Sequence, residues 1–265
     1  MMEQKEIGIR EIPPLQKWIV LSLQHVFAMF GATILVPILV GISPATALVS
    51  SGLGTLTYLL VTRGQIPAYL GSSFAFIMPM ITAITIGGVE GMLVGSFVSG
   101  LVYGVVALFI KTSGVNWLMK LLPPIVVGPV IMVIGLGLST TAIDMAMNDP
   151  VTGEYNGTLF LIALATLFIT IIGSVFFKGF FGLIPILIGI IGGYTIAYLA
   201  GVVDFTPVLE AKWFEMPEFY IPFVTYTPSI SWAIIGIMAP VALVTISEHI
   251  GDQMVLSKIA ERNFL

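Results

Sequence analysis

Long, nearly uninterrupted apolar runs separated by short polar stretches dominate this chain of 265 residues. The runs are eight in number, with these approximate bounds: Trp18–Ile42, Pro44–Thr62, Gln65–Ile86, Gly91–Ile110, Val115–Ile143, Leu159–Phe177, Phe181–Val203 and Ser231–Leu256. A helix crosses a bilayer with roughly 20 apolar residues, whereas a barrel strand alternates apolar and polar positions over about ten. Since a helix satisfies its own backbone groups in lipid, the pattern predicts an all-α polytopic membrane protein with about eight transmembrane helices.

The basic residues test this count through the rule that they concentrate on the cytoplasmic side of a membrane. With the N-terminus inside, the only basic residue among the 10 that falls outside is Lys212. The inner side then receives Lys5, Arg10, Lys17, Arg63, Lys111, Lys120, Lys178, Lys258 and Arg262. This asymmetry predicts that both ends of the chain are cytoplasmic.

Composition supports a membrane location, because only 9% of the residues are charged and 57% are hydrophobic. Soluble domains carry about 25% charged residues, so this chain lacks the polar surface to cover a water-soluble globule. The segment Met1–Lys17 is polar, and the apolar run after it is too long for a secretory signal peptide. Lipid is therefore an expected partner, and the few scattered basic residues argue against nucleic acid.

The third run differs from the others because GQIPAYLGSSFAFIMP holds Pro67, Gly71, Ser72, Ser73 and Pro79. Proline removes a backbone donor and restricts the residue before it. One interpretation is a proline-kinked helix with serines bonded to their own turn. The favoured interpretation is a broken span, with an extended Ser72–Phe76 followed by a half-helix whose N-terminal amides face a ligand.

Glycines spaced four residues apart occur at Gly87, Gly91 and Gly95, at Gly100 with Gly104, and at Gly189 with Gly193. This spacing lets helix backbones approach closely in lipid. We expect ordinary tight helix packing at these positions in preference to a specific dimer seam.

Titratable side chains gather in the last run, where Glu248 and Asp252 are four residues apart and share one helix face. Glu248 lies more than two turns before the charged inner end of that helix, and acidic residues at such depth usually face the bundle interior or a wet cavity. Either these acids bond neighbouring helices or they serve the function. His249 is one position after Glu248 and therefore lies on a different face of the helix. For His25 in the first run, we favour an interhelical hydrogen bond over a proton-relay role.

Other chemistries find little support in the residues. With 2 histidines and no cysteine, we expect no transition-metal site, no disulfide and no cofactor. The chain has no nucleophile elbow, P-loop or dinucleotide fingerprint, so an enzyme or an ATP-driven pump is not favoured.

Four motifs closely resemble the bacterial uracil permeases, a branch of the nucleobase/ascorbate transporter family: LQHVFAMFGATILVP, GQIPAYLGSSFAFI, IPILIGIIGGY and SEHIGD. They occur in the family's order, and the similarity runs over essentially the whole chain. The resemblance implies a proton-coupled uracil symporter of the bacterial inner membrane that works by alternating access. It also implies two inverted seven-helix repeats, of which this chain would hold the first repeat and the first helix of the second.

The resemblance assigns domains, with residues 1–114 and 229–265 in a core domain and 115–228 in a gate domain. It implies that Glu248 binds the pyrimidine ring and couples to the proton, with Asp252 adjusting Glu248. It further implies that Phe74 binds through its backbone, with Ser73 and Ala32 lining the pocket. His25 and His249 remain candidates for structural or relay roles, and a homodimer of the full-length protein stays open.

Two departures from the family pattern affect these expectations. Some uracil permeases have histidine where this chain has Asp252, which affects proton handling and substrate choice. The family also supplies a second glutamate from a later span, whereas this chain ends at Leu265 after the eighth, so we expect spans nine to fourteen to be missing and the chain to be inactive alone. A purine (xanthine) permease of the same family and an anion transporter on the same inverted-repeat fold are the alternatives.

Overall fold

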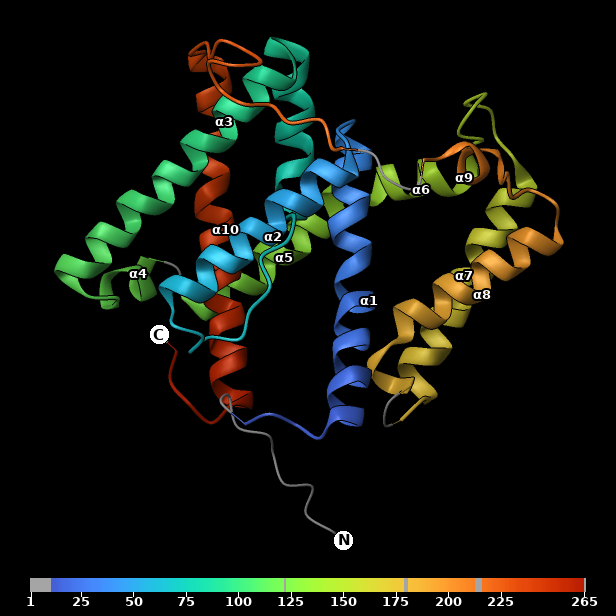
Figure 1. Cartoon of the computed structure of the whole chain (residues 1–265), viewed down its shortest axis with the longest axis horizontal. Helices are drawn as coiled ribbons and strands as arrows, with labels where there is room; N and C mark the ends of the chain where they lie inside the picture. Colours follow the sequence, from blue (N-terminus) through green and yellow to red (C-terminus); the bar gives the residue numbers. More distant parts are fainter. Residues whose placement is uncertain (1–10, 122, 179–180, 213–215, 265) are drawn as a thin grey trace, which may run out of the picture. The chain divides into compact units, whose positions relative to one another are not determined.

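The protein is described here by a computed structural model that covers residues 11–121, 123–178, 181–212 and 216–264. Within these residues the chain is helical, with two isolated β-bridges and no strand (Figure 1). Among the described residues, six helical segments have the length and apolar composition to cross a membrane: Leu15–Val40, Pro44–Val61, Phe74–Ser113, Gly128–Met147, Gly157–Phe176 and Trp232–Ile259. The all-helical membrane fold is confirmed, whereas the count of eight separate spans is not.

Four helices follow the predicted runs closely: α1 (Leu15–Val40), α2 (Pro44–Val61), α7 (Gly157–Phe176) and α10 (Trp232–Ile259). Local sequence explains two of their starts. Proline at the first turn of α2 loses no hydrogen bond, because the first amides of a helix lack partners anyway. The Asn156 side chain caps α7 by accepting hydrogen bonds from the amides of Thr158 and Leu159.

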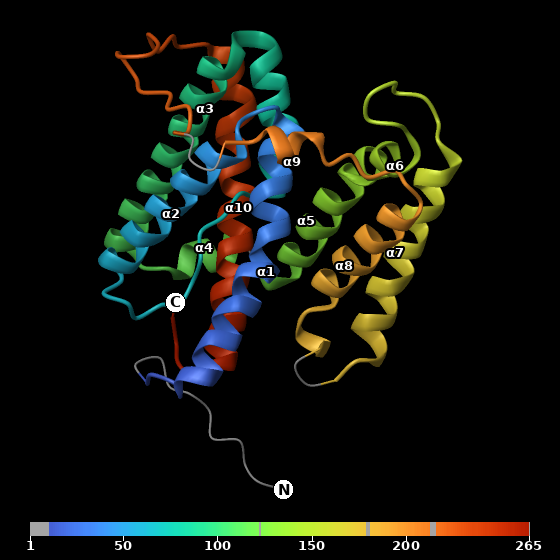
Figure 2. The ribbon, with the colours of Figure 1, turned by 45° about the vertical axis from the view of Figure 1, so that its right-hand side comes forward.

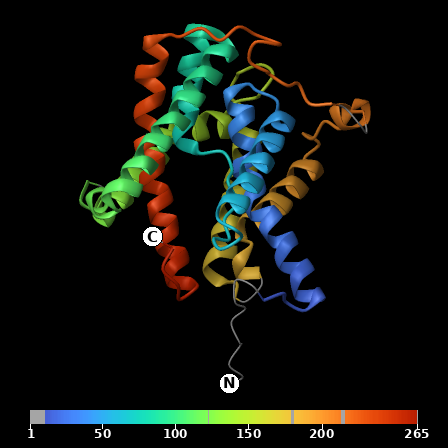
Figure 3. The same cartoon turned by 60° about the vertical axis from the view of Figure 1, so that its left-hand side comes forward.

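The third and fourth runs merge into one helical element, α3 (Ile77–Ser113), which has two arms. Gly87 and Gly88 have non-helical backbone angles within it, and Gly88 has a φ of 66°. Glycine adopts this left-handed conformation without steric penalty, so the chain reverses there and the two arms diverge (Figures 1 and 3). One continuous element therefore accounts for two predicted runs.

The fifth and seventh runs are more fragmented than predicted. The fifth becomes α4 (Asn116–Leu121), α5 (Pro124–Gly137) and α6 (Ser139–Met147). The seventh becomes a short 3₁₀ turn, η2 (Phe181–Leu183), and α8 (Pro185–Leu199), and a short α9 (Thr206–Glu210) follows it. Helices starting with a proline, as α5 and α8 do, cannot continue an earlier helix without losing a hydrogen bond.

The chain forms two compact units, which are considered separately. The first contains Ala32–Ile134 and Pro217–Leu265, and the second contains Pro13–Gly31 and Gly135–Met216. In the first unit the second arm of α3 packs along α10, with Met92, Ile234, Met238 and Ala242 buried in the contact. Leu118 of α4 adds a small cluster with Ile246 and Ile250 of α10.

The glycine spacing explains how closely these helices pack. A Cβ atom on Gly91 would lie 2.7 Å from Ile234 Cδ1, and one on Gly95 would lie 2.7 Å from Met238 Cγ. In the second unit α7 and α8 lie side by side (Figure 2), and Cβ atoms on Gly189 and Gly193 would overlap the side chains of threonines in α7. The predicted tight packing is confirmed at these glycines. Gly100 and Gly104 have the same spacing but open space beside them within the described residues.

Candidate functional site

A non-helical segment crosses the first unit between the end of α2 and the start of α3. Pro67 lies in it, and residues 67–73 have no regular structure. Thr55 of α2 holds the segment by accepting a hydrogen bond from the Leu70 amide at 3.0 Å. Since backbone groups at membrane depth need partners inside the protein, such side-chain contacts allow the helix to be broken here.

A second anchor joins this segment to α1. The Tyr69 hydroxyl lies 3.2 Å from the hydroxyl of Thr33, which is buried. A Cβ atom on Gly71 would lie 2.9 Å from the Tyr69 ring and 3.4 Å from Thr33 Oγ1, so glycine permits this close approach. Ala32 lies directly before Thr33 in α1 and is partly buried.

The break in the third run is present, but its form differs from the predicted extended Ser72–Phe76. Ser73 is extended, whereas Phe74–Phe76 form a single 3₁₀ turn, η1, that leads into α3. Ser73 Oγ accepts a hydrogen bond from the Ala75 amide at 3.3 Å and so caps this turn. A strand also needs a second strand for its ladder, and the described residues supply none beside this segment.

Glu248 of α10 meets the segment at this cap. Ser73 Oγ donates a hydrogen bond to Glu248 Oε2 at 3.2 Å, across 175 positions of sequence. Glu248 is partly buried, and Ser73 is the sole hydrogen-bond donor to its carboxylate among the described residues. A carboxylate offers about four acceptor sites, so most of its capacity remains for another molecule.

The backbone amide of Phe74 directly follows Ser73, whose hydroxyl contacts the Glu248 carboxylate. As the first residue of η1, Phe74 has no partner for its N–H among the residues that the structure describes. The site therefore combines an unused backbone donor with an anionic acceptor. A donor and an acceptor are the groups that a flat polar ring with both N–H and C=O groups on its edge would require.

Two other titratable residues of α10, Asp252 and His249, lie close to Glu248 in the sequence but do not share its hydrogen bond with Ser73. Asp252 is one turn further along and exposed. His249 is partly buried, and its ring meets that of Tyr58 in α2 edge-on at 6.2 Å. The Tyr58 hydroxyl also accepts a 3.4 Å hydrogen bond from Gln253 Nε2, and Gln253 is buried.

Sequence reasoning missed the partners that neighbouring elements supply: Thr33, Thr55, Tyr58, Tyr69 and Gln253. Only Gln253 carries a usable sequence signal, since it follows His249 by four positions and shares its helix face. His25, predicted in the first run, lies in the part of α1 that belongs to the second unit.

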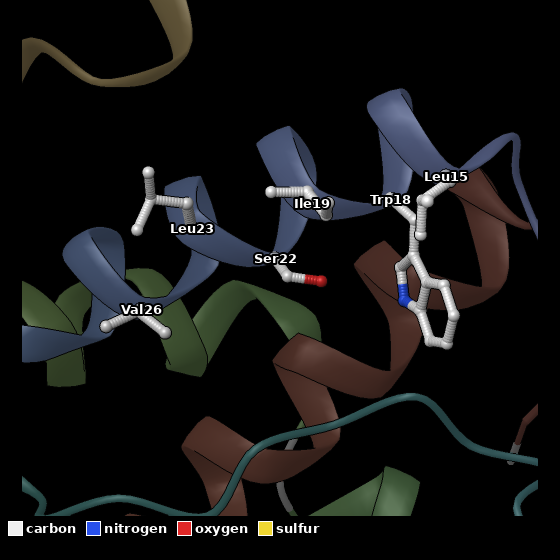
Figure 4. A pocket seen from close by; sticks show the side chains of 6 residues that line it. All are labelled: Leu15, Trp18, Ile19, Ser22, Leu23 and Val26. Carbon is white, nitrogen blue, oxygen red and sulfur yellow. The ribbon is translucent and has the colours of Figure 1, made fainter.

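An apolar hollow lies on α1, away from Glu248 in the sequence, and is lined by Leu15, Trp18, Ile19, Ser22, Leu23 and Val26 (Figure 4). These six positions repeat every three or four residues and so share one helix face. The Ser22 hydroxyl and the Trp18 indole N–H are the two polar groups on these side chains, and no charged side chain is among them. Within the described residues, no three His, Asp or Glu side chains gather as a metal site.

The fold defines a multi-pass helical membrane protein, with a candidate polar site at a broken helix. Residues 16–265 match the model of the permease family, and the chain belongs to that family.

Three relatives have the name uracil permease. The chain is 58% identical over its whole length to the Bacillus subtilis protein, 56% identical to that of Bacillus caldolyticus and 44% identical to that of Escherichia coli K12. It spans 62%, 61% and 60% of those proteins, respectively.

Proposed function

We propose that this protein serves proton-coupled import of uracil across the bacterial cytoplasmic membrane, with its N-terminus in the cytoplasm. The observation that carries the proposal is the pair formed by the Glu248 carboxylate and the Phe74 amide, both with hydrogen-bonding capacity to spare. The names of the three relatives support uracil as the substrate.

In the proposed binding mode, a ring N–H of uracil donates to Glu248 and a ring carbonyl accepts from the Phe74 amide. Hydrogen bonds to a charged group are stronger than those between neutral groups, so Glu248 would contribute most to recognition. Ser73 would orient the carboxylate, and Ala32 would lie against the ring. The same carboxylate, at membrane depth, would take up the coupled proton, and the exposed Asp252 one turn away would influence that step electrostatically.

The non-helical segment gives a physical basis for alternating access, in which one domain moves against another around a fixed midplane site. Binding groups on a broken helix and on α10 belong to the same compact unit, so they could move together. We propose that residues 1–114 and 229–265 belong to the moving core domain and residues 115–228 to the gate domain.

The test is uracil binding and uptake by the Glu248→Gln variant of the full-length protein, and the unmodified protein in each comparison is the full-length one. We expect uracil binding at least tenfold weaker, because a hydrogen bond to a charged group contributes about 1.5–3 kcal/mol. Uptake of radiolabelled uracil into proteoliposomes under an imposed pH gradient should be abolished. Excess xanthine and bicarbonate should each fail to compete for binding to the unmodified protein.

Glu90→Gln is the matched control, because Glu90 is exposed just after the Gly87–Gly88 turn. It should transport uracil like the unmodified protein. Uracil accumulation at the unmodified rate by a folded Glu248→Gln variant would refute the proposal. If xanthine or bicarbonate competed with uracil for binding, the competing compound would be the substrate in place of uracil.

A further inference from the structure

A polar pocket of about 430 Å³ lies in the first unit where α2 ends and where the chain continues beyond α10. Figure 1 shows the segment after α10 beside the end of α2. Two short segments line the pocket, with these members: Val61, Thr62, Arg63, Gln65 and Ile66, and Arg262, Asn263 and Phe264. Both segments directly follow helices that are long and apolar enough to cross a membrane, so we infer that the pocket lies near the level of the lipid headgroups.

Tight helix ends bring the two arginines into this pocket. After α2 the chain turns through Arg63 and Gly64, both with positive φ, and the Gly64 amide donates to Leu59 O at 2.8 Å. After α10 the chain turns at Glu261, whose φ is 47°, and the Arg262 amide donates to Ser257 O at 3.0 Å. These left-handed helix ends fix the backbone position from which each arginine side chain extends.

Among the described residues, no carboxylate is paired with either of the two arginines. Arg262 donates from Nη2 to the neutral side-chain oxygen of Gln65 at 3.2 Å. Neither Arg63 nor Arg262 forms an ion pair with a carboxylate in the described part of the chain. The pocket is therefore lined by two positively charged arginines, and most of their ten N–H donors have no hydrogen-bond partner among the described residues.

The backbone at Arg63 supports a role for this side chain. Its φ of 53° is left-handed, a conformation that costs residues other than glycine about 1–2 kcal/mol. Glycine or asparagine would end α2 at lower cost than arginine does. Strain of this kind points to a function of the side chain.

We propose that this pocket binds a phosphate group at the membrane surface, carried by an anionic phospholipid headgroup or free in solution. Guanidinium groups bind phosphate oxygens through paired, charge-assisted hydrogen bonds. Basic pockets between membrane helices suit anionic headgroups, and the apolar Val61, Ile66 and Phe264 can contact the glycerol and upper acyl groups. The pocket shares no residue with the Glu248 site, so this inference does not depend on the proposed function.

The test is titration of the purified protein in detergent with phosphatidylglycerol, with bound lipid counted by native mass spectrometry. Arg63→Gln and Arg262→Gln should each weaken binding about fivefold, since a basic residue near an anionic membrane surface contributes about 1 kcal/mol. The zwitterionic phosphatidylcholine should bind more weakly than phosphatidylglycerol and should respond less to the substitutions.

Arg63→Gly guards against misfolding, because glycine accepts the left-handed backbone at this position. It should keep or raise the melting temperature and still lose lipid binding. Lys111→Gln is the matched control, because this exposed lysine ends α3 and does not line the pocket. It should bind phosphatidylglycerol like the unmodified protein.

Inorganic phosphate distinguishes the two sources. If millimolar phosphate raises the melting temperature of the unmodified protein but not of the double arginine variant, while lipid binding is equal in both, the ligand is free phosphate. If the double variant binds phosphatidylglycerol as well as the unmodified protein does, and also binds phosphate as well, the proposal is overturned. An equal loss of phosphatidylglycerol binding in the Lys111→Gln variant also overturns the proposal.

Discussion

The helix pairs α3–α10 and α7–α8 use the same packing device but differ in what lies between the helices. In both, glycines four residues apart remove the side chains that would hold the backbones apart. Gly91 and Gly95 of α3 pack against Ile234 and Met238, whereas Gly189 and Gly193 of α8 pack against threonines of α7. In both pairs, a Cβ atom at these glycines would lie closer than 3.0 Å to a facing side chain.

Their polar groups are arranged differently. In the first pair Ser99 Oγ of α3 donates to Met238 O of α10 at 2.9 Å, and Ser73 just before η1 donates to Glu248 of α10. In the second pair Thr166 and Thr170 donate to carbonyls of their own helix. Glycine spacing therefore reports close packing, while hydrogen bonds that cross between elements mark the pair that carries the candidate site.

The largest expected effect comes from filling either glycine contact. Gly95→Leu and Gly193→Leu should each lower the free energy of unfolding by about 1–3 kcal/mol, because extra atoms must displace well-packed neighbours. Only Gly95→Leu should also reduce uracil binding per folded molecule, since it displaces α10. Gly104→Leu, at an open position, is the control for both, and denaturant unfolding with radiolabelled uracil binding measures the outcome. Equal uracil binding by the folded Gly95 and Gly193 variants would remove the functional difference between the pairs.

The contact between Ser73 and Glu248 should show the next largest effect. Ser73→Ala removes the donor to the carboxylate, and hydrogen bonds to charged groups contribute about 1.5–3 kcal/mol. We expect about a tenfold increase in the uracil dissociation constant, measured by equilibrium binding. Ser72→Ala is the neighbouring control and should change it little. An equal effect of the two substitutions would mean that Ser73 does not orient Glu248.

A smaller effect is expected for the interhelical bond of Ser99. Ser99→Ala should destabilise the protein by about 0.6 kcal/mol, the average for hydrogen bonds between membrane helices. Ser96→Ala should be near neutral, because Ser96 donates only to Met92 O of its own helix. Denaturant unfolding of the two variants in the same detergent compares them directly, and identical stabilities would show that the crossing bond contributes nothing.

The smallest effect concerns the loop before α7, outside the membrane spans. Amides of Thr152 and Val151 donate to the Asp149 carboxylate, and these hydrogen bonds lower the pKa of Asp149. A lowered pKa in the folded state means that the stabilisation is present above the ordinary value of 3.8 and is lost as pH falls through the lower folded value. Protection of the Val151 and Thr152 amides from hydrogen exchange should therefore decrease on acidification below about pH 4. Asp149→Asn keeps an acceptor that does not titrate. In this variant the protection of the Val151 and Thr152 amides from hydrogen exchange should therefore stay constant over this pH range.

Several features of the fold follow from local sequence. The apolar runs predicted membrane helices, and Pro67 with its glycine and serine neighbours predicted the break before α3. The depth of Glu248 within its run predicted a polar contact inside the protein. Each of these depends on residues close together in the chain, so the sequence pattern is sufficient to detect it.

Other features depended on contacts that periodicity cannot identify. Gly100 and Gly104 have the same spacing as Gly91 and Gly95 but face open space among the described residues. Helical spacing shows which residues share a face, but it does not show which face meets a neighbour. The turn at Gly87–Gly88 and the 3₁₀ form of Phe74–Phe76 were missed for a related reason, since a cap or a packed neighbour selects them.

The sequence by itself determined that this is a helical membrane protein, where its third run breaks, and that an acid lies deep in α10. Burying apolar runs in lipid and keeping backbone groups paired are requirements that each segment meets alone. Only the tertiary structure decided that Ser73 is the partner of Glu248, that Tyr58 meets His249 and Gln253, and that Arg63 and Arg262 share a pocket. Those pairings join residues far apart in the chain, so they exist only once the helices have packed.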